Sequence, residues 1–507
     1  MTSGHVEVER KFDVDGGFVL PDPADLAAAG IAATDPPVEH SLEAVYHDTA
    51  DLRLARARIT LRRRTGGSDA GWHLKLPGEG GARRELHAPL GRAVENPPPA
   101  LLDPVRGILR GAPTAPVATL RNHRVVTVLR DGEGRPLAEV ADDTVTASAS
   151  GPDGAAELQA WREVEVELLD GDVALLAPVG EWLVAAGARA SDSSSKLGRV
   201  LSSRLPAAPA TEPQESTAGE VVLAAVRGQI VALQAADVDL RIDAPDAVHQ
   251  LRVAARRLRS ILAAFRPVLD RAATEPLRTE LSWLGGELGQ ARDDEVALAH
   301  LRELVSEQPP ELVLGPVAAR LQQTAIRSAA AGREQALATL TSERYLRLLD
   351  ALYALLDEPP FASAARDPAG PVFLAAVRKS GKRLRRRVKT AKSADGDARD
   401  VALHEVRKAG KRLRYTAEVG AFGPGKPPKK LVKTAKRVQK ALGALQDTVV
   451  TREVCRRLAI EAVAAGENAF TFGHLHGLEE ARAERARAAF AELEPHLLPT
   501  LRAALRA

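Results

Sequence analysis

Carboxylates recur at every second position in two segments whose pattern predicts β-strands. In an extended 5–12 segment, Glu7, Glu9 and Lys11 share one face, because successive side chains of a strand point to opposite sides. Near 161–169 the same alternation places three more carboxylates together: Glu163, Glu165 and Glu167. Mg²⁺ and Mn²⁺ favour oxygen ligands and keep water and phosphate oxygens in their coordination shell. The two rows therefore indicate a divalent-metal site.

Other predicted strands carry arginine and lysine. One face of 58–64 holds Arg58, Thr60, Arg62 and Arg64, and Lys75 and Arg124 lie on later strands. Guanidinium groups can grip phosphate oxygens with two hydrogen bonds at once. Carboxylates and cations in one lumen are the groups that phosphoryl transfer needs, because its catalysis depends mainly on positioning and charge stabilisation. For any single strand, a surface sheet with its polar face in water is the alternative.

Period-two alternation and turn residues predict the elements that position these groups. The expected strands cover 5–12, 57–65, 72–77, 83–88, 124–130, 137–147 and 161–169. Turn signals such as Thr65-Gly66-Gly67 and Asp131-Gly132 separate them. Many short strands with such spacing predict an antiparallel β-barrel or sandwich. A closed barrel brings both kinds of charge into one lumen.

The second half of the chain is mostly helical in pattern and repeats itself. VHQLRVAARRLR at 248–259 matches LHEVRKAGKRLR at 403–414. Two further pairs keep the same order: LAAVR at 223–227 and 374–378, and LGQARDDEV at 288–296 with LGALQDTVV at 442–450, which sets Asp293 opposite Asp447. Such a repeat predicts two homologous four-helix bundles.

Each repeated helix carries a row of cations beside an apolar stripe, at positions i, i+3, i+7 and i+10. The rows are His249, Arg252, Arg256 and Arg259 in the first copy, and His404, Arg407, Lys411 and Arg414 in the second. Residues 378–440 contain 22 Lys and Arg against 5 Asp and Glu. Uncompensated like charge is destabilising, so an anionic partner is expected. A solvated charged face is the alternative interpretation.

Nucleic acid is one candidate partner for the basic segment. Aromatic residues make up only 3% of the chain, however, so platforms for stacking bases are scarce. A row of cations without stacking groups suits a bare phosphate chain better. We therefore predict that nucleic-acid binding is unlikely.

Composition agrees with a division into two parts. The 507 residues suggest two or three domains, and the formal charge of +3 hides a split of 23 − 30 = −7 over 1–205 and 47 − 37 = +10 over 206–507. Pro206, Pro209 and Pro213 mark a linker at 206–219. The helical part, 220–507, has expected halves of about 220–357 and 371–507. The single Cys455, with no pattern for a signal peptide or membrane helix, predicts a cytoplasmic protein without a membrane partner.

The first part resembles the CYTH family, the triphosphate tunnel metalloenzymes. The resemblance rests on Glu7-x-Glu9-x-Lys11, Tyr46-His47-Asp48-Thr49, Leu61-Arg62-Arg63-Arg64, Lys75-Leu76, Arg124, the Asp142 region, Glu163-Val164-Glu165 and Ser195-Lys196. It implies catalytic roles for Glu7, Glu9 and Lys11. It implies metal binding by Glu7, Glu9, Glu163 and Glu165, with Asp142 as a further candidate. Arg62, Arg64, Lys75, Arg124 and Lys196 would bind the triphosphate; Arg63 and Asp143 leave the choice between neighbours open, and Glu167, Arg58 and Arg84 are less certain.

The second part resembles the CHAD domain, an α-helical family with a basic central surface that binds inorganic polyphosphate. The resemblance carries over to both cation rows, His249 to Arg259 and His404 to Arg414. A CYTH domain followed by a CHAD domain is an arrangement of bacterial inorganic triphosphatases. We therefore expect a triphosphatase that also binds polyphosphate and associates with polyphosphate granules. The alternatives are a non-catalytic polyphosphate-binding or targeting protein and an enzyme for thiamine triphosphate or ATP.

Overall fold

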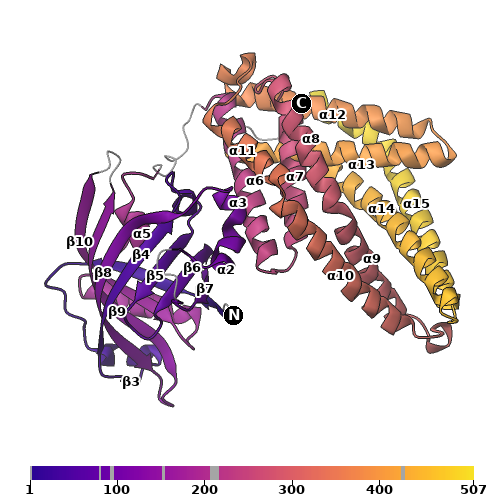
Figure 1. Ribbon diagram of the computed structural model, residues 1–507. Helices are drawn as coiled ribbons and strands as arrows, with labels where there is room; N and C mark the ends of the chain where they lie inside the picture. The colour runs from indigo at the N-terminus through magenta and orange to yellow at the C-terminus, as the bar shows by residue number, and fades with distance from the viewer. Residues whose placement is uncertain are drawn as a thin grey trace. The chain divides into compact units, whose positions relative to one another are not determined.

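The computed structural model describes residues 3–78, 82–91, 96–150, 155–193, 195–205, 216–423 and 429–506. Contacts divide the chain into two compact units, Met1–Ala210 and Thr211–Ala507. The first unit is an antiparallel sheet with short helices, and the second is entirely helical in its described part (Figure 1). The predicted fold class is therefore confirmed. Most of the predicted linker, 206–215, lies outside the described residues, and its last two residues belong to the first helix of the second unit.

The strands of the first unit form one antiparallel sheet. Its order is β1 (Ser3–Glu7), β7 (Arg83–Ala88), β6 (Gly71–Pro77), β5 (Thr60–Thr65), β4 (Val38–Asp48), β8 (Ala115–Arg130), β9 (Pro136–Ser150), β10 (Ala156–Leu168), β2 (Glu9–Val14) and β11 (Arg189–Ala190), with β3 (Ala33–Thr34) paired to β8. Only Val8 separates β1 from β2, and its carbonyl accepts a hydrogen bond from the Leu168 amide (3.0 Å). The N-terminal strand thus joins both ends of the sheet and closes it into a barrel.

One side of this sheet packs on hydrophobic side chains and leaves the other side for polar groups. Phe12, Val164 and Val166 are buried with Val179 and Leu183 of α4 (Leu176–Ala185). Because side chains alternate along a strand, the residues between them face the interior of the barrel. The remaining short helices are η1 (Pro23–Ala29), α1 (Arg53–Arg56), α2 (Pro99–Leu102), η3 (Asp103–Val105), α3 (Arg106–Leu109), η4 (Val173–Leu175) and α5 (Lys196–Val200).

The helical unit retains the duplication that the sequence predicts. Its helices are α6 (Ala218–Arg241), α7 (Ala247–Ala264), α8 (Arg271–Glu287), α9 (Gly289–Ser306), η5 (Pro310–Leu312), α10 (Val317–Thr341), α11 (Glu343–Asp357), η6 (Ser363–Arg366), α12 (Ala369–Lys392), α13 (Gly396–Glu418), η7 (Val419–Phe422), α14 (Lys429–Ala464) and α15 (Phe470–Arg506). The second half has the four expected helices. In the first half the third and fourth are each broken in two. Ser342 makes one of these breaks: its backbone is extended, and its hydroxyl accepts from the Tyr345 amide to start α11.

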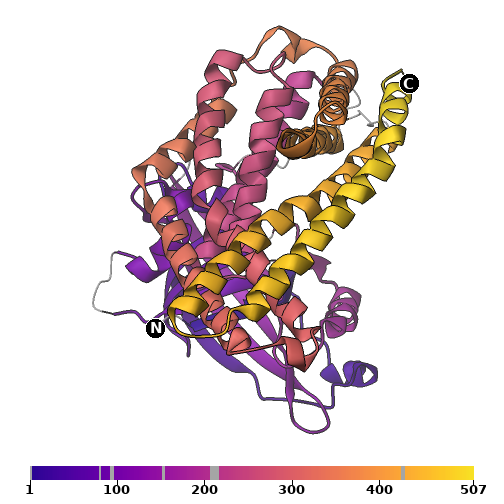
Figure 2. The same cartoon turned by 90° about the vertical axis from the view of Figure 1, so that its right-hand side faces the viewer.

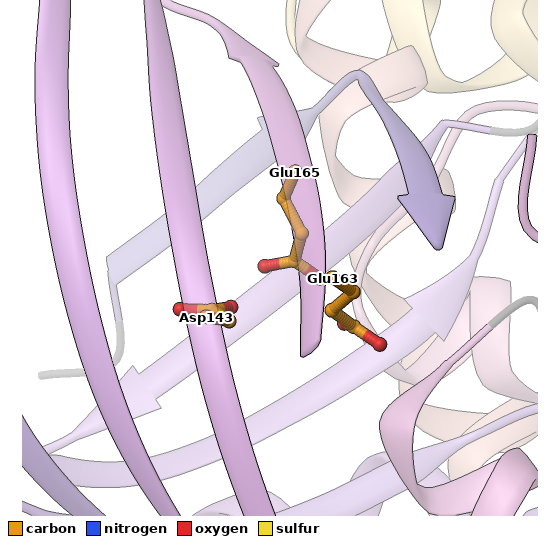
Figure 3. A group of neighbouring side chains, drawn as sticks. All are labelled: Asp143, Glu163 and Glu165. Carbon is orange, nitrogen blue, oxygen red and sulfur yellow. The ribbon is translucent and has the colours of Figure 1, made fainter. Parts of the chain in front are cut away.

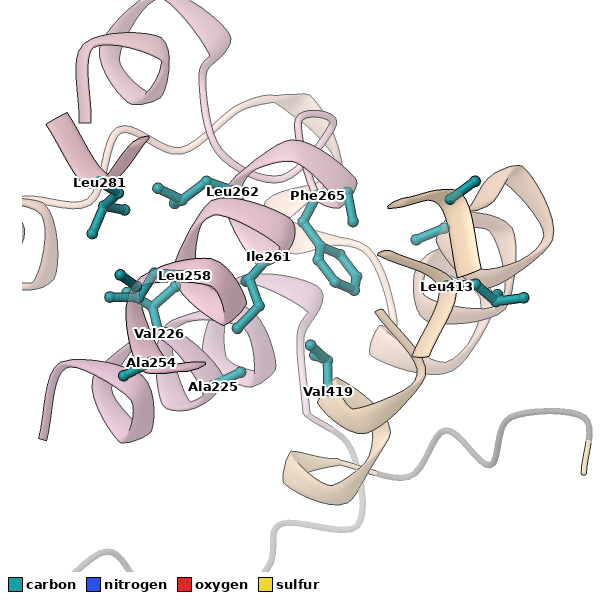
Figure 4. Close-up of a cluster of buried hydrophobic side chains, with 14 of the residues drawn as sticks. Ala225, Val226, Ala254, Leu258, Ile261, Leu262, Phe265, Leu281, Leu413 and Val419 are labelled. Carbon is teal, nitrogen blue, oxygen red and sulfur yellow. The ribbon is translucent and has the colours of Figure 1, made fainter. Parts of the chain in front are cut away.

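The two halves share their hydrophobic cores instead of forming separate bundles. One cluster joins Ala225 and Leu258 of the first half to Leu413 and Val419 of the second (Figure 4). A second cluster joins α9 and α10 to α14 and α15, for example Leu301 with Leu458. Figure 2 shows α14 and α15 side by side along their length. The repeated helices α7 and α13 are therefore held in one packed body.

One helix among the described residues, α6, has the length and hydropathy to cross a membrane. Of its most apolar window, 56% is buried inside the helical unit. Val222, Val226 and Ile230 supply part of the core described above. Its apolar character is thus accounted for by packing.

Candidate functional site

A polar cavity of about 380 Å³ lies inside the barrel. Ten charged residues singled out from the sequence line it: Glu7, Glu9, Lys11, Arg62, Arg64, Lys75, Arg124, Glu165, Glu167 and Lys196. They come from β1, β2, β5, β6, β8, β10 and α5, so segments far apart in the sequence converge on one volume. The cavity has the size of a small-molecule site.

Three buried carboxylates form a cluster at one side of this interior. Asp143 on β9 lies opposite Glu163 on β10, with Glu165 two residues further along (Figure 3). One oxygen of each lies within 4.8 Å of the others, so the group could hold a metal ion. The Lys196 ammonium already contacts all three, at 2.9 Å from Asp143 and 2.7 Å from each glutamate. Any ion at this position must compete with that lysine.

The structure corrects the candidate role of Asp142. Its carboxylate pairs with Arg162 (2.7 Å) and lies across from Val164, on the face of the sheet that points away from the cavity. Asp143 is fully buried on the other face and pairs with Arg124 (2.7 Å). The alternation from Glu139 would have favoured Asp143, because residues four apart in a strand share a face.

A second carboxylate row crosses the cavity wall. Glu9, Glu167 and Glu139 lie directly opposite one another on β2, β10 and β9. Of the described residues, Lys11 is the one cation within ion-pair distance of this row, at 3.1 Å from Glu9. Burial, followed by the nearby carboxylates, raises the pKa of Glu167 despite the opposing effect of Lys75. Like charges facing each other across strands are destabilising, so this row fits a bound cation better than the lysine-filled cluster does.

Glu7 stands at the junction of β1 and β2 and shares its surroundings with a residue that the sequence did not single out. Lys75 contacts both Glu7 (2.6 Å) and Glu85 (3.5 Å). Burial, and then the hydrogen bond with Glu85, raises the pKa of Glu7 to about 8. Glu85 faces the cavity because it pairs with Lys75, whereas the neighbouring Arg84 pairs with Leu76 on the other face. The alternation in 83–88 was the available signal for Glu85.

The cavity also holds guanidinium groups. Arg124 spans Asp143 and Glu165, the latter at 2.5 Å. Arg62 donates toward the Tyr46 hydroxyl (3.5 Å), and Arg64 pairs with Asp69. Burial, and after it the proximity of Arg62 and Arg124, lowers the pKa of Arg64. These mutually repelling cations are suited to an incoming anion.

In the helical unit, five cations of the predicted rows lie together. We call Arg252, Arg256, Arg407, Lys411 and Arg414 the central basic cluster; they come from α7 and α13. Arg252 contacts Asp293 at 3.0 Å, and Arg256 donates to the Tyr415 hydroxyl at 2.9 Å. Burial, followed by repulsion from the four arginines, lowers the pKa of Lys411 to about 7. Arg414 pairs with Glu418 (3.2 Å), so the five cations outnumber the described carboxylates that pair with them.

The remaining predicted residues occupy other positions. His404 is hydrogen-bonded to Gln446 on α14 (2.6 Å), and His249 holds the equivalent place on α7. Arg259, at the far end of its row, lies near Arg278 on α8, outside the central basic cluster.

Comparison with known proteins identifies the two units. A CYTH domain model matches residues 5–195, and a CHAD domain model matches residues 224–456. The chain is a CYTH–CHAD protein. Two uncharacterized proteins of Mycobacterium tuberculosis, MT2285 and Rv2226, are each 41% identical over 500 residues, covering 95% of this chain and 94% of their own length.

Solved structures similar to this CYTH–CHAD protein include PptA from Streptomyces chartreusis. That structure is 22% identical, has a TM-score of 0.44 and covers 55% of this chain and 99% of its own. The CHAD domain from the plant Ricinus communis is 27% identical, with a TM-score of 0.43 and coverage of 60% and 98%.

Family membership gives a coarse function. CYTH family members act on triphosphates and depend on a metal, and CHAD domains are linked to polyphosphate. This CYTH–CHAD protein therefore has a triphosphate-related activity.

Proposed function

We propose that the barrel cavity hydrolyses inorganic triphosphate with the help of Mg²⁺ or Mn²⁺. The observation that carries this proposal is the sharing of one cavity by a row of three carboxylates, of which Glu9 alone is paired with a described lysine, and a set of cations. A cavity with only cations would bind phosphate without a metal. The carboxylate row opposite them supplies oxygen ligands for a cation that also touches the substrate.

The residues divide by charge. Glu7, Glu9, Glu163 and Glu165 are proposed metal ligands, to which we add Glu139 and Glu167 from the row that faces Glu9. Arg62, Arg64, Lys75, Arg124 and Lys196 are proposed to hold the phosphate oxygens, and Lys11 links the two groups through Glu9 and Glu165. A bound divalent ion lowers the pKa of water and neutralises phosphate charge.

We also propose that the helical domain binds inorganic polyphosphate through the central basic cluster. Its support is the gathering of four arginines around Lys411, which lowers the pKa of this lysine, because a bound anion would relieve their repulsion. Binding of this kind would also hold the protein at polyphosphate granules.

Phosphate release from inorganic triphosphate, ATP and thiamine triphosphate, each with Mg²⁺ or Mn²⁺, tests the enzymatic proposal. We expect inorganic triphosphate to be hydrolysed fastest, because the described cavity lining contains Tyr46 and His40 but no Phe or Trp on which a base or thiazole could stack. Folded protein that releases phosphate from none of the three is not a triphosphatase. Retention of polyphosphate by such a protein would leave the non-catalytic binding protein as the answer.

A further inference from the structure

Five arginines gather around the C-terminal end of α7. We call Arg259, Arg266, Arg278, Arg383 and Arg412 the second basic cluster; they come from α7, the turn after it, α8, α12 and α13. Arg278 donates to the Arg259 carbonyl (3.3 Å), and Arg412 donates to the Ala263 carbonyl (2.6 Å). All five side chains are half-buried. Two of the five arginines are therefore held by backbone carbonyls of α7.

This cluster has too few carboxylates for its charge. Within the described part of the chain, Glu275 alone pairs with its members, namely Arg266 (2.8 Å) and Arg278. The buried Nε atoms of Arg259, Arg266 and Arg412 have no hydrogen-bond partner there. Burial, followed by Arg383, Arg278 and Arg266, lowers the pKa of Arg412 to about 10. Buried donors without acceptors and mutually repelling cations call for an anion.

The second basic cluster continues the central one. Arg259 follows Arg256 by three residues and lies on the same face of α7. Arg256 is close enough to Lys411 to lower its pKa, and Arg278 does the same to Arg259. A run of cations thus leads from the middle of α7 to its C-terminal end.

The duplication should place an equivalent cluster at the other end, and the sequence breaks that symmetry. Arg257, which corresponds to Arg412 at the offset of 155, pairs with Glu418 (3.2 Å), and Glu418 stands where the first copy has Ala263. At the offsets of the repeat, Arg266 corresponds to Ala421 and Arg383 to Ala232. At that end alanine replaces two of the five arginines and Glu418 pairs with Arg257, so the second copy carries less positive charge there.

We propose that the second basic cluster is a phosphate-binding site that takes the additional phosphate groups of a long linear polyphosphate. The proposal rests on polyphosphate binding at the central basic cluster. Guanidinium groups suit this ligand because each can contact two phosphate oxygens. A long chain leaves the central basic cluster toward Arg266 and Arg383, and a short oligophosphate fills the central cluster alone.

Binding of two ligands to the full chain without metal tests this inference: a short linear oligophosphate and a long polyphosphate. The double variant Arg266→Gln/Arg383→Gln should lose about tenfold or more in affinity for the long chain, since it removes two charge-assisted contacts. Its affinity for the short chain should stay unchanged, which also shows that the variant is folded. The matched control Lys389→Gln/Lys392→Gln removes the same charge from the exposed C-terminal end of α12.

A variant that removes a negative charge should have the opposite effect on affinity. Glu418→Gln removes the carboxylate that pairs with Arg257 and with Arg414 of the central basic cluster, and it should raise affinity for both ligands. The inference is overturned if Arg266→Gln/Arg383→Gln lowers the affinity for the long chain no more than the lysine control does. It is also overturned if single-stranded DNA competes for the site as well as polyphosphate does. If the wild-type protein binds neither ligand, polyphosphate binding itself fails. Loss of both ligands in Arg252→Ala/Arg407→Ala, with no loss in Arg266→Gln/Arg383→Gln, would retain the proposed function and reject only this extension.

Discussion

The barrel cavity and the central basic cluster both collect cations at poorly exposed positions, but they compensate them in opposite ways. Burial alone would lower the pKa of Lys196, yet Glu165, Asp143 and Glu163 raise it well above its usual value. Burial also lowers the pKa of Lys411, and there the surrounding arginines lower it further, to about 7. The barrel thus neutralises its own charge, whereas the helical domain keeps a positive surplus.

This difference separates two ways to bind phosphate. In the barrel, ion pairs hold each side chain in place, and a metal with its triphosphate can exchange for these internal partners at little net change in charge. In the helical domain the central basic cluster has only Asp293 and Glu418 as paired carboxylates among the described residues, so a polyanion gains mainly from the relief of repulsion. Binding there should depend on salt and chain length more than on geometry.

The largest effect should come from Asp143, with its neighbour as control. Asp143→Asn removes one charge from a fully buried group that pairs with Arg124 and Lys196. Breaking such a pair should lower the free energy of unfolding by about 3 kcal/mol, and triphosphate hydrolysis should fall by about 100-fold or more.

The control Asp142→Asn makes the same chemical change one residue away, on the outer face. It should cost about 1 kcal/mol or less and leave hydrolysis intact. Thermal unfolding and phosphate release measure both variants. Equal losses in the two would contradict the assignment of Asp143 to the buried carboxylate cluster.

The next largest effect should come from the double variant Arg252→Ala/Arg407→Ala, which removes two cations of the central basic cluster. We expect polyphosphate affinity to fall by about 100-fold, since two charge contacts disappear. For the same reason, the slope of log affinity against log salt concentration should become shallower by about two. Triphosphate hydrolysis should be unaffected. Titration at several salt concentrations measures the slope, and an unchanged affinity would place the binding surface elsewhere.

Glu139→Gln should have an intermediate effect, and it tests whether Glu139 is a metal ligand. The Mg²⁺ concentration for half-maximal rate should rise by about tenfold, because one of three facing carboxylates is lost. Glu133→Gln, in the exposed turn between β8 and β9, is the matched control and should change nothing. Identical metal dependence in both variants would exclude Glu139 as a ligand.

The smallest effect should be the pH dependence set by Lys411. Its folded pKa of about 7 lies below the ordinary value of 10.5, so the unfolded state binds more protons between these limits and stability without ligand should rise with pH across that window. The ammonium favours the bound polyanion without being essential, so polyphosphate affinity should fall by about threefold per pH unit above 7. Lys411→Arg should flatten both profiles in urea unfolding and in binding, and a wild-type affinity independent of pH would reject the role of this lysine.

The sequence pattern predicted the strands that carry rows of charged residues well, and it predicted the strands without such rows poorly. Alternation located the strands that carry Glu9, Arg62 and Glu165, because charge on one face stands out against valine on the other. It missed β4, whose cavity face carries Leu42, Ala44 and Tyr46 in place of a charged row. It also extended 57–65 too early: Arg58 has a positive φ of 60° and precedes the strand.

Other parts needed the tertiary structure. The choice between Asp142 and Asp143 depends on the register of β9 against β10, which no single strand specifies. The duplication gave both basic rows, but the packing that brings Arg407 and Lys411 beside Arg256 requires the fold. The sharing of one core by both halves was likewise invisible in the repeat, because the apolar stripes of separate and of interleaved bundles look the same.

The rate of phosphate release from inorganic triphosphate, measured against Mg²⁺ concentration in the wild type and in the Glu9→Gln/Glu167→Gln variant, tests the central claim most directly. We expect saturable, chelator-sensitive release by the wild type. We also expect its loss in the variant, which retains polyphosphate binding. Release that persists in the variant or in the presence of chelator would contradict the assignment of the barrel as a metal-dependent triphosphatase.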